Sequence, residues 1–300
     1  MLLGSLWAYG KSRLSKRRAR LSPTSQALEC TAESSSKPLP LVTIIIPTRD
    51  KANLLDRCIQ SVKHKTTYTN FEILVVDNQS REQASLELFS KLKSAGVRVL
   101  SFDQPFNYAA ISNLAVNHAN GDYICLLNND TEVISGDWLS SMMSHATNAS
   151  TGFVGSILLS PAGAVQHAGL ALGFAGIAEH AYAGQAMDQV EPQEAVSACH
   201  AVEAVTFACA LIGKEKYLAL GGLDEDFAIG LNDVDACIRA SRSGLTNVLC
   251  AKATLTHIES ATRPKALSAK GAFRAFSEVS QFLAKYRFGS LGDRYHLEAS

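Results

Sequence analysis

Several common signatures are missing from this chain of 300 residues, and each absence excludes a class of protein. No Gly-x-Gly-x-x-Gly turn follows the first apolar run, which disfavours a dinucleotide-binding Rossmann fold. No Gly-x-x-x-x-Gly-Lys-Ser/Thr motif occurs, which disfavours a P-loop enzyme. No apolar run is long enough to be a transmembrane helix. A bound phosphate group must therefore be held by a metal ion and by side chains.

Paired cysteines are also missing. The chain has seven cysteines, an odd number, and no two of them form a Cys-x-x-Cys pair. This pattern indicates neither a disulfide framework nor a zinc knuckle. Several of the cysteines lie inside apolar runs, where a thiol behaves as a small core residue. We therefore expect a reducing, cytoplasmic location.

Net charge is absent as well, since 28 basic residues balance 28 acidic ones. The first twenty residues hold six basic residues and no acidic one, so the rest of the chain is mildly acidic. This balance argues against a nucleic-acid-binding surface. Two interpretations of the basic head stay open. One is a solvated tail, which we favour slightly, and the other is peripheral contact with the anionic inner face of a membrane.

The rest of the chain has what a sizeable core needs, with 47% hydrophobic residues. Short apolar runs, typical of buried strands, alternate with segments of helical periodicity up to about residue 130. The predicted strands are 41–46, 71–76, 97–102 and 123–127, and the predicted helices begin near residues 53, 82 and 109. This alternation predicts an α/β fold with a mostly parallel central sheet flanked by helices.

A polar cluster, Asn128-Asn129-Asp130, directly follows the fourth predicted strand. Ligands of open α/β sheets bind at the carboxyl ends of the strands, so we expect Asp130 to lie in a binding crevice. A lone carboxylate beside amide oxygens suits a hard cation such as Mg²⁺ or Mn²⁺. The alternative is a plain turn between a strand and a helix.

Two further candidates lie in the second half of the chain, where residues 160–200 show no readable pattern. Asp233 falls in the first turn of a predicted amphipathic helix, a position that favours an ionised carboxylate and makes it available as a base. His257 and Glu259 stand two apart at a predicted strand end, where they could bind a metal or a phosphate. An ordinary first-turn acid and a structural histidine are the alternatives.

Six polar loop motifs occur in order along the chain: IIIPTRD (44–50), VVDN (75–78), LLNNDTEV (126–133), GLDED (222–226), NDVDACIR (232–239) and HIES (257–260). In order and spacing they resemble the family 2 glycosyltransferases with the GT-A fold. The closest resemblance is to bacterial enzymes that build O-antigen and other surface polysaccharides. Each motif alone is weak, but the six together are specific.

The resemblance implies a role for each motif. Nucleotide binding falls to the loops after the first, second and fourth strands, at Pro47, Thr48, Arg49, Asp50, Asp77, Asn78, Asn128 and Asn129. Asp130 matches the metal-binding acid that ends the family's Asp-x-Asp motif, His257 resembles a residue near the metal, and Asp233 matches the catalytic base. Asn128 replaces the first acid of that motif and Asn232 replaces a Glu before the base, so weaker metal affinity is expected.

The resemblance also implies a domain plan. We expect a flexible basic tail and linker over 1–40 and a glycosyltransferase domain over 41–265. Within that domain, 41–135 would bind the nucleotide sugar and 136–265 would hold the acceptor and catalytic groups. A C-terminal helix and tail would follow over 266–300.

The function expected from these residues is metal-dependent, inverting transfer of a sugar from a nucleotide-diphospho-sugar donor to a hydroxyl of a glycan or lipid-linked glycan acceptor. A catalytically silent nucleotide-sugar-binding protein is one alternative. A sugar-phosphate nucleotidyltransferase is the other, although Pro47-Thr48-Arg49-Asp50 is not the glycine-rich basic loop that such an enzyme needs.

Overall fold

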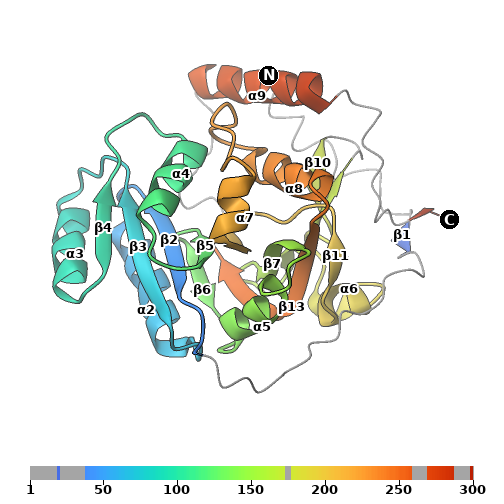
Figure 1. The fold of residues 1–300 in the computed structure, drawn as a ribbon, viewed down its shortest axis with the longest axis horizontal. Helices are drawn as coiled ribbons and strands as arrows, with labels where there is room; N and C mark the ends of the chain where they lie inside the picture. The colour runs from blue at the N-terminus through green and yellow to red at the C-terminus, as the bar shows by residue number, and fades with distance from the viewer. Residues whose placement is uncertain (1–18, 21–37, 173–176, 259–268, 287–297, 300) are drawn as a thin grey trace.

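The computed structural model describes residues 19–20, 38–172, 177–258, 269–286 and 298–299. One large sheet runs through the molecule, with the strand order β11-β13-β7-β12-β5-β2-β3-β4 along its main path (Figure 1). These strands are β2 (Val42–Thr48), β3 (Phe71–Asp77), β4 (Arg98–Ser101), β5 (Tyr123–Leu127), β7 (Thr151–Leu159), β11 (His200–Val202), β12 (Cys209–Gly213) and β13 (Thr246–His257).

Shorter strands join or accompany the sheet. β6 (Thr131–Val133) pairs with β13, and β8 (Val165–His167) pairs with β7. Outside the large sheet, β9 (Leu170–Leu172) pairs with β10 (Ala178–His180), and β1 (Ala19–Arg20) pairs with β14 (Glu298–Ala299).

Helices pack on both faces of the sheet. They are α2 (Ala52–Lys65), α3 (Gln83–Ser94), α4 (Tyr108–His118), α5 (Trp138–Ala146), α6 (Glu194–Ser197), α7 (Lys214–Ala219), α8 (Asn232–Arg242) and α9 (Ala269–Tyr286), together with the 3-10 helix η2 (Met187–Gln189). Neighbouring strand residues point to opposite faces and build two separate cores. Ile45 and Leu126 join the core under α4 and α8, whereas Ile44 and Leu127 join the core under α2 and α5.

The predicted fold class is confirmed, with one addition. β2, β3, β4 and β5 are parallel neighbours, as the alternation of strands and helices indicated. β12 runs antiparallel to both β5 and β7, while β13 runs parallel to β7. β5, β7 and β13 therefore point in the same direction across β12. Their carboxyl ends share one edge of the sheet, and the residues just before β12 lie at that edge too.

The region after residue 150 holds most of the structure that the sequence pattern missed. The patternless segment 160–200 contains β8, β9, β10, η2 and α6, all of which are short. Helix α5 was not predicted either. The predicted tail and linker over 1–40 lies outside the described residues, except for 19–20 and 38–40, and Glu259 lies outside them as well.

The last helix is part of the packed fold. In α9, Phe282 and Tyr286 are buried, and Phe282 lies against Phe227 with ring centroids 5.8 Å apart. Figure 1 shows α9 lying across the end of the molecule that carries α8. None of the helices described combines the length and apolar character that crossing a bilayer requires.

Candidate active site

Asp130 and His257 meet at the shared edge of the sheet. Asp130 follows β5 and His257 ends β13, so the common direction of these strands brings the two residues together. His257 Nε2 lies 3.2 Å from Asp130 Oδ1, and the backbone N–H of Ile258 donates to the carbonyl of Asp130 at 2.9 Å. The prediction that Asp130 lies at the carboxyl edge is consistent with this placement.

The contact between these two side chains is a close approach and not a hydrogen bond. Asp130 Oδ1 is buried and accepts no hydrogen bond, even though Nε2 of His257 is 3.2 Å away. Nδ1 of His257 lies 3.1 Å from Oε1 of Gln166, an acceptor, so the neutral ring carries its proton on Nδ1. Nε2 then carries a lone pair, which lies 3.4 Å from Nδ2 of Asn128 and faces the buried Asp130 Oδ1.

Two electron-pair donors that face each other in a buried site fit a cation between them. A separation near 3 Å is what two ligand atoms about 2.1–2.2 Å from one ion adopt at neighbouring coordination positions. Gln166 would belong to the outer coordination shell, because its hydrogen bond with Nδ1 fixes the tautomer of the ligating ring. Asn128, whose Nδ2 lies 3.4 Å from Nε2, stands where a second acid would stand in an Asp-x-Asp motif. The donor set therefore fits one divalent cation with one carboxylate and one imidazole.

The loop after β2 is tied to the cation loop. Asn129 is buried and its Nδ2 donates to Thr48 Oγ1 at 2.8 Å. Pro47 is half-buried at the end of β2, whereas Arg49 is exposed at the same edge. Arg49 and Lys51, both exposed, are therefore the basic side chains of this loop that a donor can reach.

Two residues expected to bind the nucleotide are engaged within the protein. The Asp50 carboxylate accepts from the N–H groups of Arg81 and Glu82 at 2.7 and 2.9 Å, and these bonds, with that from Glu82 first, hold its pKa below the usual range. Asn78 is 1% exposed, and its Nδ2 donates to the carbonyls of Phe102 and Gln104. Both side chains fix the loops around the edge of the sheet.

Asp77 is placed differently. It ends β3 and stays half-buried, and its Oδ1 accepts from the N–H of Ser80 at 2.9 Å. No hydrogen bond to its Oδ2 is recorded within the described residues. Asp77 therefore keeps one oxygen available for a ligand, and it accepts one fewer backbone hydrogen bond than Asp50 does.

Asp233 lies in the first turn of α8, as predicted, but its surroundings differ from the expectation. The carboxylate is crowded by protein atoms, and burial raises its pKa above the usual value. The N–H of Val234, the imidazole of His180 and the hydroxyl of Thr206 each lower the pKa in part. The helix position alone suggested a plainly ionised acid, whereas the structure shows a carboxylate whose charge depends on these donors.

His167 and His180 form a pair beside this acid. Their Nδ1 atoms are 2.9 Å apart, and His167 Nε2 accepts from the N–H groups of Gly169 and Thr206 at 3.4 and 3.3 Å. Burial is the largest cause that lowers the pKa of His167, so the ring is neutral. Because Nε2 accepts, the proton of His167 sits on Nδ1 and is donated to His180. His180 Nδ1 is then an acceptor, and its own proton is on Nε2.

Asp235 and Asp224 also flank the helix, but both have structural partners. Asp235 is fully buried and contacts Arg239, Lys285 and Tyr286 at 2.8, 2.6 and 2.5 Å. Asp224 accepts from Lys285 at 2.6 Å. These contacts fasten α9 to α8 and give both acids a structural role, unlike Asp233.

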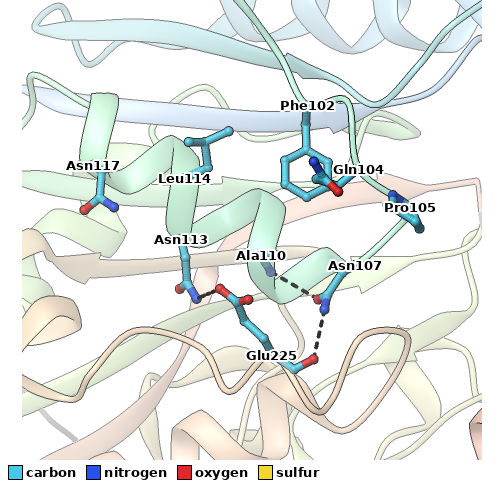
Figure 2. Close-up of a pocket in the computed structure, with 9 residues that line it drawn as sticks. All are labelled: Phe102, Gln104, Pro105, Asn107, Ala110, Asn113, Leu114, Asn117 and Glu225. Atoms are coloured by element: carbon cyan, nitrogen blue, oxygen red, sulfur yellow. Dashed lines mark hydrogen bonds between the residues drawn. The ribbon is translucent and has the colours of Figure 1, made fainter.

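An open pocket of about 550 Å³ lies beside α4, away from the predicted residues (Figure 2). Its walls include Phe102 and Gln104 from the loop after β4, Asn113 from α4, and Glu225. Asn113 Nδ2 donates to Glu225 Oε1 at 3.1 Å across its floor. Asn78 holds the carbonyls of Phe102 and Gln104, so this sequence-predicted residue shapes the pocket wall without lining it.

Sequence reasoning missed Gln166, His167 and His180. All three lie in the segment without a readable pattern, and only β8, β9 and β10 bring them to the site. A histidine within a run of small apolar residues gives no sign of the partner that it meets in the fold. The spacing of His167 and His180, both near glycines, offered no recognised motif.

The fold and this edge define a class of protein. The structure resembles GalNAc-T7 solved with UDP, GalNAc and Mn²⁺, with a TM-score of 0.62 and 16% identity over 74% of this chain and 44% of that one. It also resembles the mannosyltransferase PcManGT from Pyrobaculum calidifontis, solved with GDP-Man and Mn²⁺, with a TM-score of 0.57 and 14% identity over 95% and 70%. The chain therefore has the GT-A glycosyltransferase fold.

Sequence comparison identifies the family. Residues 43–180 match the model described as Glycosyl transferase family 2. The chain is 36% identical over 225 residues to the O-antigen biosynthesis protein RfbC of Myxococcus xanthus, covering 75% of this chain and 18% of that protein. The chain belongs to glycosyl transferase family 2. It spans a quarter or less of the length of the curated relatives that match it over 225 residues or more.

Proposed function

We propose that this domain is a metal-dependent, inverting glycosyltransferase that moves a sugar from a nucleotide-diphospho-sugar to a hydroxyl of a growing glycan. The observation that carries the proposal is the set of polar groups at the shared carboxyl edge of the sheet. There a buried carboxylate and imidazole, 3.2 Å apart, suit a cation, and a second acid with a raised pKa lies in the half of the chain that follows. One cation site and one separate base are what single displacement on a diphospho-sugar needs.

The cation proposed for Asp130 and His257 is Mn²⁺ in preference to Mg²⁺. Mg²⁺ takes oxygen ligands almost exclusively, while an imidazole nitrogen suits a first-row transition metal. When bound, the ion supplies positive charge that neutralises the departing diphosphate. Asp130 and His257 would hold it, and Gln166 holds the imidazole through Nδ1.

Asp233 is proposed as the general base that takes the proton from the acceptor hydroxyl. A carboxylate with a raised pKa binds the acceptor's proton more tightly than an ordinary carboxylate does, but it must still be ionised before the reaction. In this proposal the Nε2 proton of His180 is directed at the carboxylate and keeps it ionised, while His167 fixes the tautomer of His180. His180 is thus a positioning residue that acts through Asp233.

Donor recognition is assigned to the side chains that stay accessible. Arg49 is exposed and Asp77 keeps one oxygen available, so these two are proposed to contact the nucleotide. Pro47 and Thr48 shape the loop between them. Asp50, Asn78 and Asn129 act through the loops that they hold.

The acceptor is proposed to be a bacterial surface polysaccharide or its lipid-linked precursor. The support is the 36% identity to a protein of O-antigen biosynthesis. The large difference in length from that relative means that further domains of such proteins can contribute to acceptor choice. Peripheral contact of the basic head with a membrane stays part of the proposal, because the described residues do not include that segment.

Donor binding and hydrolysis test this function together. The chain is incubated with a panel of nucleoside diphosphates and nucleotide sugars, with Mn²⁺, with Mg²⁺ or with a chelator, and the melting temperature and released diphosphate are recorded. We expect one nucleotide to stabilise the protein in the presence of Mn²⁺ and its sugar to be released slowly. Asp130→Ala should lose the Mn²⁺-dependent part of both signals.

Asp122→Ala is the matched control, since the exposed Asp122 stands just before β5 while Asp130 stands just after it. It should behave as the wild type. Unchanged affinity for the nucleotide in Asp130→Ala with Mn²⁺ present would refute the metal assignment. Binding of the donor without any turnover in the wild type, with every acceptor offered, would favour the silent binding protein.

A further inference from the structure

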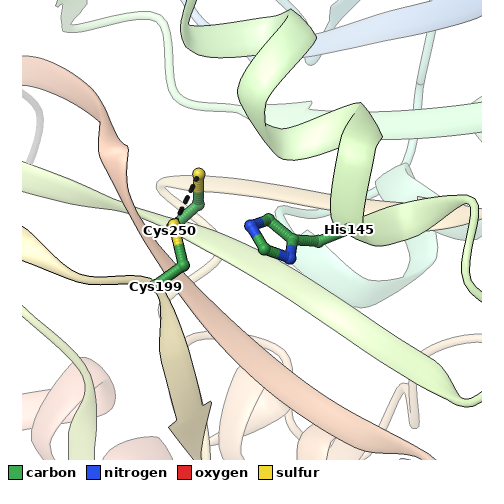
Figure 3. A group of neighbouring side chains, drawn as sticks. All are labelled: His145, Cys199 and Cys250. Carbon is green, nitrogen blue, oxygen red and sulfur yellow. Dashed lines mark hydrogen bonds between the residues drawn. The ribbon is translucent and has the colours of Figure 1, made fainter. Parts of the chain in front are cut away.

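A second group of side chains that could hold a metal ion shares no residue with the Asp130 site. His145 ends the last turn of α5, Cys199 stands just before β11, and Cys250 lies within β13. All three are buried, and their ligand atoms lie within 4.8 Å of one another. Figure 3 shows the imidazole turned toward the two sulfur atoms.

The spacing of the sulfur atoms carries the argument. The Sγ atoms of Cys199 and Cys250 are 3.7 Å apart, well beyond the length of a disulfide bond of about 2.05 Å. Two thiolates that each lie about 2.3 Å from a tetrahedral Zn²⁺ stand about 3.8 Å apart. The observed separation therefore matches the edge of a zinc coordination tetrahedron.

The fold brings the thiols together in register. β11 and β13 are antiparallel, with His200 opposite Leu249, so the preceding Cys199 faces the following Cys250 across the two strands. α5 packs over this part of the sheet and supplies the imidazole from its last turn. Three elements far apart in the sequence thus converge on one point.

The backbone around the sulfurs supports thiolates. The pairing of β13 with β7 shifts register between Cys250 and Thr254, which frees backbone groups in that stretch. The N–H groups of Lys252 and Ala253 are directed at the sulfur atoms, the kind of outer-shell donation that metal thiolates use.

We propose that His145, Cys199 and Cys250 form a zinc site that joins α5 to β11 and β13. Imidazole and thiolate are both common zinc ligands, and two cysteines with one histidine and an open fourth position are a ligand set that zinc is known to use. The fourth position falls to water or a small anion, since Cys199 and His145 keep 7% and 6% of their surface open. Cys199 and Cys250 are 51 residues apart in the sequence, so no short motif announces the site.

The chain contains a matched control. Cys125 and Cys209 are a second buried, interacting thiol pair. Within the described residues they belong to no group of three or more ligands that could hold a metal ion. If two neighbouring thiols were enough for metal binding, this pair would bind as well as the proposed site.

The test uses the full chain, stripped of metal under reducing conditions and titrated with Co²⁺ and then with Zn²⁺. We expect one equivalent of Co²⁺ to give thiolate charge-transfer absorption and the visible bands of a tetrahedral ion, both abolished by Zn²⁺. The Asp130 site has no sulfur, so its failure or success cannot produce this signal. Zn²⁺ should also raise the melting temperature.

Single-residue variants show which side chains produce the Co²⁺ absorption. Cys199→Ala and His145→Gln should each weaken Zn²⁺ binding by more than the roughly 10- to 100-fold that loss of an outer-shell partner costs. Cys125→Ala should leave the spectrum unchanged, and a far-ultraviolet spectrum will show that each variant is folded. A spectrum that survives in folded Cys199→Ala or His145→Gln, no charge-transfer band in the wild type, or a mass loss of about 2 Da from a Cys199–Cys250 disulfide, would overturn the proposal.

Discussion

Asp233, the proposed general base, is a side chain whose charge is costly to the fold. Burial raises its pKa, so its ionised form is less stable in the folded protein than in water. At a pH above that raised pKa, a charged Asp233 therefore lowers the free energy of unfolding. A neutral side chain of the same size would avoid this cost.

Asp233→Asn should consequently keep or slightly raise the free energy of unfolding, within about 1 kcal/mol, because an amide oxygen still accepts from Val234. Turnover should fall about 10²- to 10⁴-fold, since the amide cannot take a proton. Donor affinity should be unchanged. Urea unfolding, turnover and nucleotide titration measure the three quantities, and a variant that loses donor binding together with turnover would remove Asp233 from the base role.

His180→Ala should move the acidic limb of the pH–rate profile to higher pH. His180 lowers the pKa of Asp233, so its removal raises that pKa, and the base is then ionised only at higher pH. Tyr108 and Cys237 also face Asp233, but burial raises the pKa of each, so both are neutral over the measured range.

His180→Asn, which keeps a side-chain N–H, should shift the limb less than His180→Ala does. His64→Gln, an exposed change on α2, should not shift it at all. In His180→Ala, activity could instead be reduced equally at every pH, with no change in the shape of the pH–rate profile. That result would show that His180 has a purely structural role.

At the scale of elements, α9 controls the segment that leads into α8. Leu231, the residue before α8, has a left-handed backbone with φ of 61°, which is costly for a branched side chain. Glu278 of α9 accepts from the N–H groups of Ile229 and Gly230, both at 3.0 Å. Its negative charge near the start of α8 also suits the helix dipole. The helix expected to follow the catalytic domain is therefore a support of the base.

Glu278→Ala should lower the free energy of unfolding by about 1–3 kcal/mol, because it leaves two backbone donors without their carboxylate. Turnover should fall as well, since the segment that positions Asp233 loses its anchor. Glu87→Ala, an exposed change on α3, is the control and should cost less than about 0.5 kcal/mol. Equal stability of the two variants in urea would show that α9 does not hold this segment.

The elements also show where sequence reasoning succeeds and where it stops. β2, β3 and β5 were readable because strands buried on both faces are continuous apolar runs. The polar residues after these strands could be placed in loops, because an apolar run that forms a buried strand has to end in a loop. β8, β9 and β10 are three residues each, too short for any periodicity.

The candidate site was predictable to the same extent. Asp130 and Asp233 stand beside readable elements, and both were identified. His167 and His180 gain their meaning from a 2.9 Å contact that only the folded chain makes. Asp50 and Asn78 look like ligands in the sequence, because a polar residue at a strand end reads the same whether it faces a substrate or a neighbouring loop.

At the scale of the whole molecule, the large sheet begins at Val42, and we propose that residues 1–37 are dispensable for folding. A chain that starts at residue 38 should show the same melting temperature, within about 2 °C, and the same Mn²⁺-dependent nucleotide binding. Calorimetry and nucleotide titration of both chains test this expectation. Aggregation of the shorter chain, or a loss of its cooperative transition, would place part of the fold in the head.

The placement of His257 at the end of β13 also determines when the proposed cation site can form during synthesis. Asn128 and His257 are 129 residues apart, and the strands between them must pair before the two halves of the cation site meet. At about 5–20 residues per second, a ribosome needs roughly 6 to 26 seconds to travel that distance. Throughout this interval the nascent chain exposes the nucleotide half without the imidazole ligand. If the proposed cation site is right, an unfinished chain lacks one of its two ligands, and the site forms only after β13 has joined the sheet.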